Sequence, residues 1–453
     1  MIRFVFSMIL GFVYLLTGCF STPGTIRDIQ ELKQDHAVYL GGRMPEAPMM
    51  NPEEQRQRDR EYNERYFSPW HGNQTRCSLA DIAFEFEKYG KSRGYGENGR
   101  KHDRSWIKKL EANARLQNYP DAGYPAITIR HSNMRALPTG KPYFGSARQS
   151  VSGYPFDNLQ VTAVMVNTPV FISHISRDKA WVFVETSYSS GWMKAVDVAS
   201  LSGDFIKQWE TGSYAVITKD KMPLYDGNGL FLFRGALGAI FPMVERREKR
   251  IEILVAVADA DRRAVLKKIA VSAEAIAAKP VPMTAARMAR MANELINEPY
   301  GWGGLHGNRD CSAMIRDLIA PFGIWLPRHS ADQAQSGGTF IDLSTLTAEE
   351  KEKKIVSEGI PYLTLLWRQG HIVLYIGDLN GKPLVFHNFW GISTQSVFGR
   401  KGKFIVGHAA ITTMHPGREL LNYNRNAADL AVNIQGMTLL AGRFGNPRPP
   451  GRQ

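Results

Sequence analysis

The sequence predicts an α+β protein with a helical N-terminal segment, two small β-barrels and a C-terminal domain in which one helix packs on an antiparallel sheet. Three observations support this prediction. Apolar residues recur at helical spacing up to about residue 115, short alternating strands follow from about residue 125, and helical spacing returns near residue 284, ahead of two further strands. A chain of 453 residues is long enough for two to four domains.

The first eighteen residues have the pattern of an export signal. Arg3 precedes an apolar run over residues 4–16, which is too short to span a bilayer. The run ends in the letters LTGC, which look like the lipid-attachment box of bacterial lipoproteins. We therefore predict a signal peptide over 1–18, lipidation of Cys19 and a membrane-anchored protein facing the periplasm. Phe20, rather than Asp, follows the lipidated residue, which favours the outer membrane. An ordinary secretory signal with an incidental cysteine is the alternative.

Composition restricts the class of partner. The net charge of +13 is spread along the chain, and no helix-turn-helix, zinc-finger or RNA-binding strand motif is present, so we predict no nucleic-acid partner. A dispersed positive charge suits an anionic envelope surface or acidic substrates. The chain has 3 cysteines, too few for a disulfide-stapled scaffold. A Cys77–Cys311 bridge stays open as an alternative, although it would abolish any nucleophilic role of Cys311.

The region between the signal and the strands is predicted to be helical. A polar spacer leads into the charged run NPEEQRQRDREYNER over 51–65, where helix is expected. Ser78 and Ser105 each precede apolar residues at three- and four-residue spacing, so we expect them to be N-caps. We predict a mostly helical stabilising segment over 19–135.

Two sets of short strands follow, each the size of a five- or six-stranded barrel. Runs of about five β-branched and aromatic residues alternate with polar ones and are separated by Asp, Asn, Ser and Gly. We place the first barrel at 136–207 and the second at 208–270. The stretch SAEAIAAKPVPM is interpreted as a linker, after which Thr284 caps an amphipathic helix. The C-terminal domain is predicted over 283–415, with a tail over 416–453.

The stretch GGLHGNRDCSAMIRDLI places a cysteine where a helix begins. A helix is predicted from there to about Gly323, because apolar residues fall on one face at Ile315, Leu318, Ile319 and Phe322. Asp310 is then near the N-cap and Cys311 lies in the first turn. Unsatisfied N–H groups and the helix dipole favour a thiolate at this position, as a nucleophile requires. A buried structural cysteine is the alternative.

A base is expected on the hairpin GHIVLYIGDLNGKPLVFHNFW. Two strands, 371–378 and 382–388, are joined near an Asn-Gly pair, and the loop length decides where the two histidines lie. A two-residue loop places His371 and His387 on opposite faces. A three-residue loop, a type I turn closed by a left-handed Gly381, makes them diagonal neighbours on one face. We predict the three-residue loop.

In that arrangement His371 takes the thiol proton and forms a thiolate–imidazolium pair, while His387 holds the other ring nitrogen of His371. Two histidines and a cysteine also suggest a zinc site, but no fourth ligand has suitable local spacing. We therefore predict no metal and no cofactor.

Four ordered segments, PYGWGG…RDCSAMIRDL, LPRHSADQA, GHIVLYIG and VFHN, resemble the NlpC/P60 cysteine peptidases, which have a compacted papain-like fold. The resemblance covers roughly residues 285–415. Upstream, GYPFDNLQ, GALGAIFP and the sequence Ser-Gly-Trp at 190–192 resemble a subgroup with a helical stabilising segment and two bacterial SH3-like domains.

The resemblance implies an activity and a set of site residues. It assigns the nucleophile to Cys311, the base to His371 and the third polar residue to His387. Such enzymes cleave the γ-D-glutamyl–L-diamino acid bond of peptidoglycan stem peptides, so muropeptides are the expected partner. In recycling members a free L-alanine amine is held at positions that fall here on Asp310, Ser312 and Ser330. The first SH3-like domain also contacts substrate in such enzymes, for which we select Glu185 and Tyr188.

Two other classes stay open. The SH3-like modules would also fit a wall-binding lipoprotein with an inactive peptidase domain, although the intact cysteine and histidines argue against it. The same fold could also carry an amidase or acyltransferase. Only work with substrates separates the latter from a peptidase.

Overall fold

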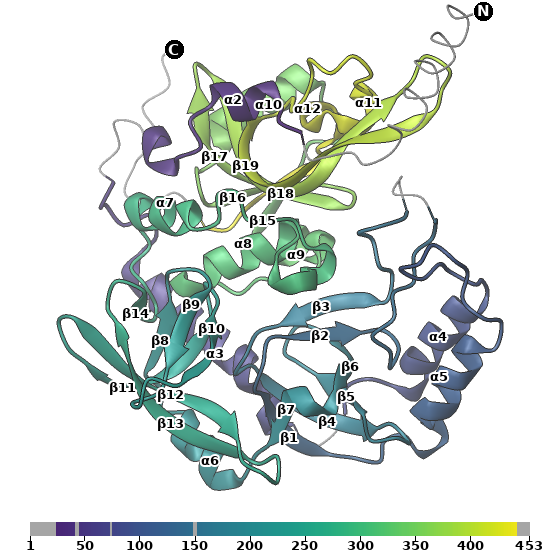
Figure 1. Cartoon of the computed structure of the whole chain (residues 1–453). Coiled ribbons are helices and arrows are strands. Elements are labelled where there is room, and N and C mark those ends of the chain that lie inside the picture. Colours follow the sequence, from purple (N-terminus) through teal and green to yellow (C-terminus); the bar gives the residue numbers. More distant parts are fainter. Residues whose placement is uncertain (1–23, 41–44, 73–74, 148–151, 442–453) are drawn as a thin grey trace, which may run out of the picture.

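The computed structural model describes residues 24–40, 45–72, 75–147 and 152–441. Figure 1 shows the C-terminal domain above the two barrels, with helices α8 (Cys311–Ile319) and α9 (Ser330–Ser336) between them. The helix that carries Cys311 therefore lies where the domains meet. The predicted lipidation site, Cys19, is outside the described residues. Within the described ranges, no helix combines the length and hydropathy needed to cross a membrane.

The described part of the N-terminal segment contains four α-helices. They are α2 (Arg27–Glu31), α3 (Pro52–His71), α4 (Leu79–Gly90) and α5 (Trp106–Ala114). The Ser78 hydroxyl accepts from the N–H of Asp81, whose carboxylate accepts from the N–H of Ser78, so the predicted cap of α4 is a complete capping box. Ser105 precedes α5, but its side chain makes no capping hydrogen bond to that helix.

Helix α3 joins the three other parts of the molecule through a buried aromatic face. The Tyr62 ring packs edge-on against Trp325 of the C-terminal domain, with ring centroids 5.4 Å apart. Phe67 packs on Tyr214 of the second barrel at 5.2 Å, and Trp70 Nε1 donates to a backbone carbonyl of the first barrel at 2.8 Å. The helix predicted from the charged run therefore extends to His71, and its aromatic side chains connect the domains.

The first barrel begins earlier than predicted. Its strand order is β3-β2-β6-β5-β4-β1-β7, so two strands that precede residue 136 belong to it. A Cβ on Gly191 would lie 2.8 Å from the carbonyl oxygen of Arg135, so only glycine lets β6 approach β2 this closely, and neighbouring Trp192 is fully buried. The strands are β1 (Tyr124–Thr128), β2 (Ser132–Arg135), β3 (Gln160–Val164), β4 (Pro169–Ile175), β5 (Trp181–Glu185), β6 (Ser190–Lys194) and β7 (Val198–Ser200).

Helix α6 (Gly203–Trp209) leads into the second barrel, which extends further along the chain than predicted. Its strands are β8 (Tyr214–Ile217), β9 (Met222–Tyr225), β10 (Phe231–Gly235), β11 (Ile240–Arg246), β12 (Arg250–Ala258), β13 (Ala264–Ser272) and β14 (Ile276–Ala278), in the orders β10-β9 and β13-β12-β11-β8-β14. The stretch interpreted as a linker contains β14, which pairs with β8. Ile276 is buried there, so this apolar residue closes the domain.

The C-terminal domain has one sheet in the order β15-β20-β16-β17-β18-β19. Its strands are β15 (Thr339–Asp342), β16 (Thr364–Arg368), β17 (His371–Leu379), β18 (Lys382–Gln395), β19 (Lys401–Thr413) and β20 (Gly436–Leu439). Its further helices are α7 (Ala285–Asn293), α10 (Ala348–Glu358), α11 (Arg425–Ala428) and α12 (Leu430–Asn433). The prediction of a tail from 416 is wrong for the described part. Strand β20 pairs with β15 and β16 because its apolar residues, such as Met437, are fully buried.

Candidate active site

Cys311 is the first residue of α8, as the sequence predicted. Asp310 is the N-cap, and its carboxylate accepts from the N–H of Ala313 at 2.9 Å. The backbone N–H of Ile372, on strand β17, hydrogen-bonds the Cys311 sulfur. The cysteine therefore lies directly against the strand that begins with His371.

Arg328, which sequence reasoning missed, holds the Asp310 carboxylate. Its guanidinium donates to both oxygens, at 3.1 and 2.6 Å, and Gly303 N–H donates to the same carboxylate at 3.1 Å. Arg328 also donates to the Ser312 hydroxyl at 2.8 Å and to Thr162 of the first barrel at 2.6 Å. Burial raises the pKa of Asp310, but Arg328 and these hydrogen bonds outweigh it and hold the pKa below its usual value.

The two predicted histidines meet. The distance from His371 Nε2 to His387 Nδ1 is 2.9 Å, and His387 Nε2 lies 3.0 Å from the Thr412 hydroxyl. That hydroxyl donates to the Thr413 carbonyl, so it accepts from His387 Nε2–H. His387 Nδ1 is then an acceptor and His371 Nε2 a donor. His371 Nδ1 is left without a proton, as a base requires.

A β-bulge, not the predicted three-residue loop, brings the histidines to one face. The loop has two residues, because Leu379 pairs with Lys382, and both Asn380 and Gly381 have positive φ, at 53° and 75°. The register then shifts between Tyr375 and Gly377. The loop prediction is therefore wrong, although the predicted pairing of the histidines is correct.

Burial keeps the resting site neutral. Burial raises the pKa of the Cys311 thiol to about 12, with a further contribution from the Asp310 carboxylate, and outweighs the nearby N–H groups and Arg328. Burial likewise lowers the pKa of His371 to about 3. Both shifts act against the thiolate–imidazolium pair expected from the helix terminus. Desolvation is the stronger effect here.

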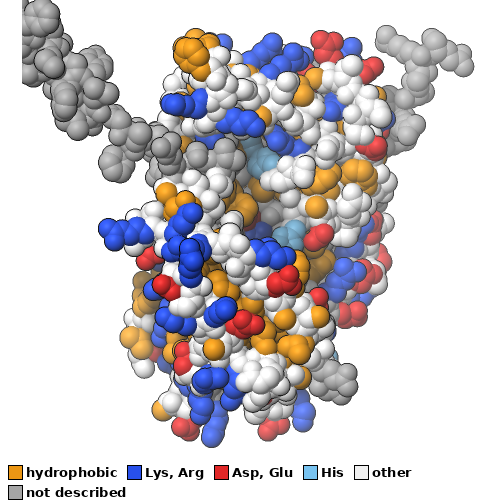
Figure 2. All heavy atoms as spheres, turned by 90° about the vertical axis from the view of Figure 1, so that its right-hand side faces the viewer, with side chains coloured by type: hydrophobic (Ala, Val, Ile, Leu, Met, Phe, Trp, Pro, Cys, Tyr) orange, Lys and Arg blue, Asp and Glu red, His pale blue; other side chains and the backbone are white. Residues whose placement is uncertain are grey.

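Cys311 lines a cleft of about 730 Å³, which we call the cysteine cleft. Helix α4, the first barrel and the C-terminal domain all contribute walls. Four of the five predicted substrate-binding residues line this cleft: Asp310, Ser312, Ser330 and Tyr188. In the space-filling view, histidine side chains are visible in the hollow at the middle of the molecule, and basic side chains are interspersed with acidic ones (Figure 2).

The fifth, Glu185, is placed elsewhere. Its side chain is 2% exposed, and its carboxylate accepts from the Thr75 hydroxyl and from the Arg76 N–H, the latter at 2.8 Å. It anchors the segment ahead of α4 and is not among the residues that line the cysteine cleft. The alternating strand pattern could not reveal this, because the contact joins segments about 110 residues apart.

Tyr300 is a further functional candidate that the sequence argument did not select. It lines the cysteine cleft and also a smaller neighbouring cavity that contains His371. Burial raises the pKa of its hydroxyl well above 10, and the charges of Cys311 and Asp310 raise it further. Tyr300 therefore keeps its proton and can donate a hydrogen bond beside the nucleophile. Its position in the PYGWGG stretch was the only sequence signal.

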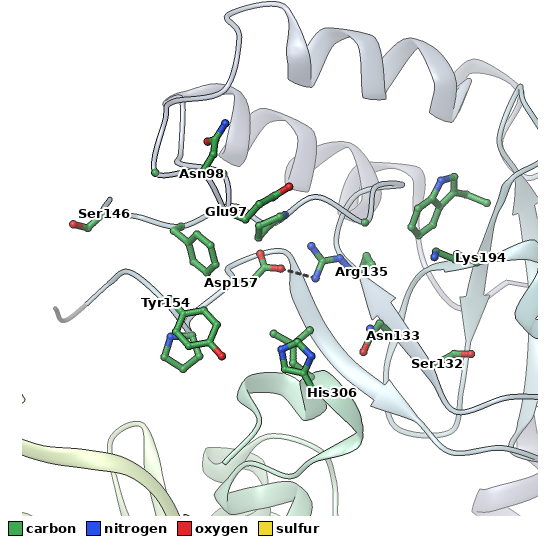
Figure 3. Close-up of a pocket in the computed structure, with 18 of the residues that line it drawn as sticks. Glu97, Asn98, Ser132, Asn133, Arg135, Ser146, Tyr154, Asp157, Lys194 and His306 are labelled. Atoms are coloured by element: carbon green, nitrogen blue, oxygen red, sulfur yellow. Dashed lines mark ion pairs between the residues drawn. The ribbon is translucent and has the colours of Figure 1, made fainter. Parts of the chain in front are cut away.

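A larger cavity, of about 970 Å³, lies between the first barrel, the 96–99 loop and the tip at His306 (Figure 3). It contains neither Cys311 nor the histidine pair. Arg135 and Asp157 face each other there in an ion pair of 2.7 Å, and the Asp157 carbonyl accepts from Trp302 Nε1 at 3.0 Å. This pair therefore supports Trp302, which lines the cysteine cleft.

Two other points bear on the chemistry. Cys77 and Cys311 are both free thiols, so the alternative of a bridge between them is not realised. Within the described part of the chain, no group of three or more His, Cys, Asp or Glu side chains is placed to hold a metal ion.

Four family models match the chain in order. They are the NLPC_P60 stabilising domain over residues 8–119, the SH3 domain of SH3b1 type over 142–194, the SH3 domain of SH3b2 type over 202–248 and the NlpC/P60 family over 297–400. No curated protein matches the sequence.

The chain is also similar to several solved structures. An NlpC/P60 endopeptidase from Photobacterium damselae subsp. piscicida is 25% identical, with a TM-score of 0.82 over 92% of this chain and 99% of that one. An NlpC/P60 family protein from Bacillus cereus is 16% identical, with a TM-score of 0.43 over 62% and 82%. NlpC2 from Trichomonas vaginalis is 12% identical, with a TM-score of 0.24 over 64% and 96%.

A cysteine at the start of a helix, packed on an antiparallel sheet that carries its histidine, defines a papain-like cysteine peptidase. The order of domains identifies the family. The chain belongs to the NlpC/P60 cysteine peptidases, in the form with a helical stabilising segment and two SH3-like domains. The two barrels are these SH3-like domains, and the C-terminal domain is the catalytic domain.

Proposed function

We propose that this peptidase hydrolyses the γ-D-glutamyl–L-diamino acid bond of peptidoglycan stem peptides. The observation that carries the proposal is the hydrogen-bonded series from His371 through His387 to Thr412, on the strand against which Cys311 lies. Further support comes from the two SH3-type domains and from the similarity over nearly the whole chain to a protein described as an endopeptidase.

The chemistry follows from the neutral resting pair. As the Cys311 sulfur attacks the γ-glutamyl carbonyl, its proton passes to His371 Nδ1, so no standing thiolate is needed. The backbone N–H groups near the start of α8 and the Tyr300 hydroxyl are placed to stabilise the oxyanion. His371 then protonates the leaving amine. It next activates a water molecule, which hydrolyses the thioester, releases the γ-glutamyl acid and restores the Cys311 thiol. His387 holds the His371 ring throughout.

We also propose that the protein is a periplasmic lipoprotein anchored through Cys19. The support is the LTGC sequence after a short apolar run. The test is the mass of the mature N-terminus in wild type and in Cys19→Ala. A diacylglyceryl adduct on wild type alone is the expected result, and an unmodified cysteine would contradict the anchor.

The cleft suggests that stem peptides need not have a free N-terminus. Both Asp310 carboxylate oxygens already accept hydrogen bonds from Arg328, so a substrate ammonium group would have to compete with Arg328 for them. Asp81 and Glu85 of α4 line the same cleft, so it extends beyond the residues predicted to hold the L-alanine amine. We therefore expect peptides with a free L-alanine amine and peptides capped by muramic acid to be cleaved.

Mass spectrometry of the products from these two muropeptides tests the proposal, with Cys311→Ala as the control. Release of L-Ala-γ-D-Glu or its capped form from both substrates is the expected result. Cleavage of the free peptide alone would assign Asp310 to an amine pocket and make the protein a recycling enzyme. Cleavage at the muramoyl–L-alanine bond would make it an amidase. No difference between wild type and Cys311→Ala would favour a wall-binding module.

A further inference from the structure

A small cavity of about 190 Å³ adjoins the cysteine cleft, and we call it the histidine cavity. His371 and His387 line it, and it shares Tyr300, Trp302 and Gly370 with the cysteine cleft. The two spaces therefore meet at these three residues, with Cys311 on one side and His371 on the other. The volume is well below that of a pocket for a whole small-molecule ligand and suits a single amino-acid residue.

Two basic side chains, Arg368 and Lys403, line the histidine cavity without a carboxylate partner. None of the described ion pairs, which require 4.0 Å or less, includes either residue, and no Asp or Glu lines the cavity. Arg368 donates one hydrogen bond, to the Ala427 carbonyl at 3.0 Å, and Lys403 Nζ lies 5.1 Å from the centre of the Phe156 ring.

Both cations are partly withdrawn from water. Burial lowers the pKa of each, and the charge of Arg368 further lowers the pKa of Lys403. Both charges also lower the pKa of His371, after burial, so they lie close to the catalytic histidine. Charged groups in such surroundings are usually paired, and two uncompensated cations in one cavity match an anionic ligand.

The reaction determines which part of the substrate enters this cavity. Cys311 attacks the acyl carbonyl, so the γ-glutamyl side lies in the cysteine cleft. His371 protonates the leaving amine, so the residue that bears this amine lies against the histidine cavity. If the proposed function holds, that residue is the diamino acid.

We propose that Arg368 and Lys403 bind a carboxylate on the side chain of the leaving diamino acid. The preferred third stem residue is therefore a diaminodicarboxylic acid of the diaminopimelate type. Such a side chain offers a carboxylate for charge-assisted hydrogen bonds. A lysine side chain ends in an ammonium group alone, which the two cations repel. This inference rests on the proposed function.

The test uses two tetrapeptides, L-Ala-γ-D-Glu-X-D-Ala, in which X is meso-diaminopimelate or L-lysine. The terminal D-alanine keeps the main-chain carboxyl of X in an amide, so only its side chain differs. We expect kcat/KM to favour diaminopimelate by about 10- to 100-fold, from hydrogen bonds between charged groups. Amidation of the side-chain carboxylate should remove this preference.

Arg368→Gln and Lys403→Gln should each lower kcat/KM for diaminopimelate and move the ratio toward one, while Arg368→Lys should keep much of it. Lys401→Gln, at an exposed position on the same strand as Lys403, is the matched control and should keep the full ratio. Equal cleavage of both peptides by wild type, or an unchanged ratio of the two kcat/KM values in both Gln variants, would overturn this inference but not the proposed function. Cleavage of neither peptide would overturn the proposed bond as well.

Discussion

At the scale of single residues, Cys311 is subject to two opposing influences. The start of α8 favours the thiolate, while burial and the Asp310 carboxylate favour the thiol and raise the pKa to about 12. Burial likewise favours neutral His371, and we expect the proton to be transferred during the attack step.

The first prediction concerns the pH dependence of Cys311 alkylation. A raised pKa means that the thiolate fraction at neutral pH is lower than for an ordinary cysteine. The rate with iodoacetamide should therefore rise about tenfold per pH unit through neutral and mildly alkaline pH. Cys77→Ser together with Cys19→Ala isolates the signal from Cys311. A rate that is already constant below pH 7 would show a standing thiolate.

The second prediction concerns the residues behind His371. His387→Ala should lower kcat by about 10²- to 10⁴-fold with little change in KM, because the base loses its orientation. Thr412→Val should have a smaller effect, since Thr412 acts only through His387, and Thr412→Ser should restore activity. Steady-state kinetics on one muropeptide measures all three. Equal rates for His387→Ala and wild type would remove His387 from the mechanism.

Sequence motifs were sufficient to place Cys311, His371 and His387, because each lies in a recognisable local pattern. They could not show that Arg328 donates hydrogen bonds to the Asp310 carboxylate, or that the Glu185 carboxylate accepts a hydrogen bond from the Arg76 N–H. These contacts join distant segments, so no local spacing reports them.

At the scale of elements, the β17–β18 hairpin shows how a correct pairing can arise by another route. The type I′ turn alone would place the histidines on opposite faces, and the bulge before Gly377 reverses that outcome. The Asn-Gly pair indicated the turn, but the bulge leaves no comparable mark. Strands β14 and β20 also leave little mark in the sequence. Their short apolar runs look like linker and tail, and only pairing with distant strands makes them part of a sheet.

The third prediction compares two glycines of this hairpin. Gly377 has φ of 130° at the bulge, and Gly381 has φ of 75° in the turn, so alanine strains both. Each substitution should cost about 1–3 kcal/mol in the free energy of unfolding, measured with urea. Only Gly377→Ala should also lower kcat, because the bulge sets the register of the histidines. An unchanged kcat in Gly377→Ala would separate the bulge from the site.

At the scale of the whole molecule, the second SH3-like domain supports the nucleophile without lining the cysteine cleft. Asp220 of that domain accepts two hydrogen bonds of 2.8 Å from Arg309, which also donates to Asp317 on α8 at 2.8 Å. A Cβ on Gly238 would lie 2.6 Å from the Asp317 carbonyl oxygen, so the domain packs directly on the helix. The sequence predicted this domain but not its contact with α8.

The fourth prediction tests this support. Asp220→Asn removes one of the carboxylates around the buried Arg309 guanidinium and should cost about 1–3 kcal/mol in the free energy of unfolding. It should also lower kcat, because Arg309 lies two residues before Cys311. Glu245→Gln, which breaks an exposed ion pair of the same domain, is the control and should leave both quantities unchanged. Wild-type stability in Asp220→Asn would contradict this role.

The most direct test of the account is digestion of purified peptidoglycan in H₂¹⁸O, followed by tandem mass spectrometry of the products. Hydrolysis through a Cys311 thioester should place ¹⁸O in the γ-carboxyl group of D-glutamate and release peptides that begin with the diamino acid. Cys311→Ala should give neither product. Label in any other carboxyl group, or the same products from Cys311→Ala, would contradict the account.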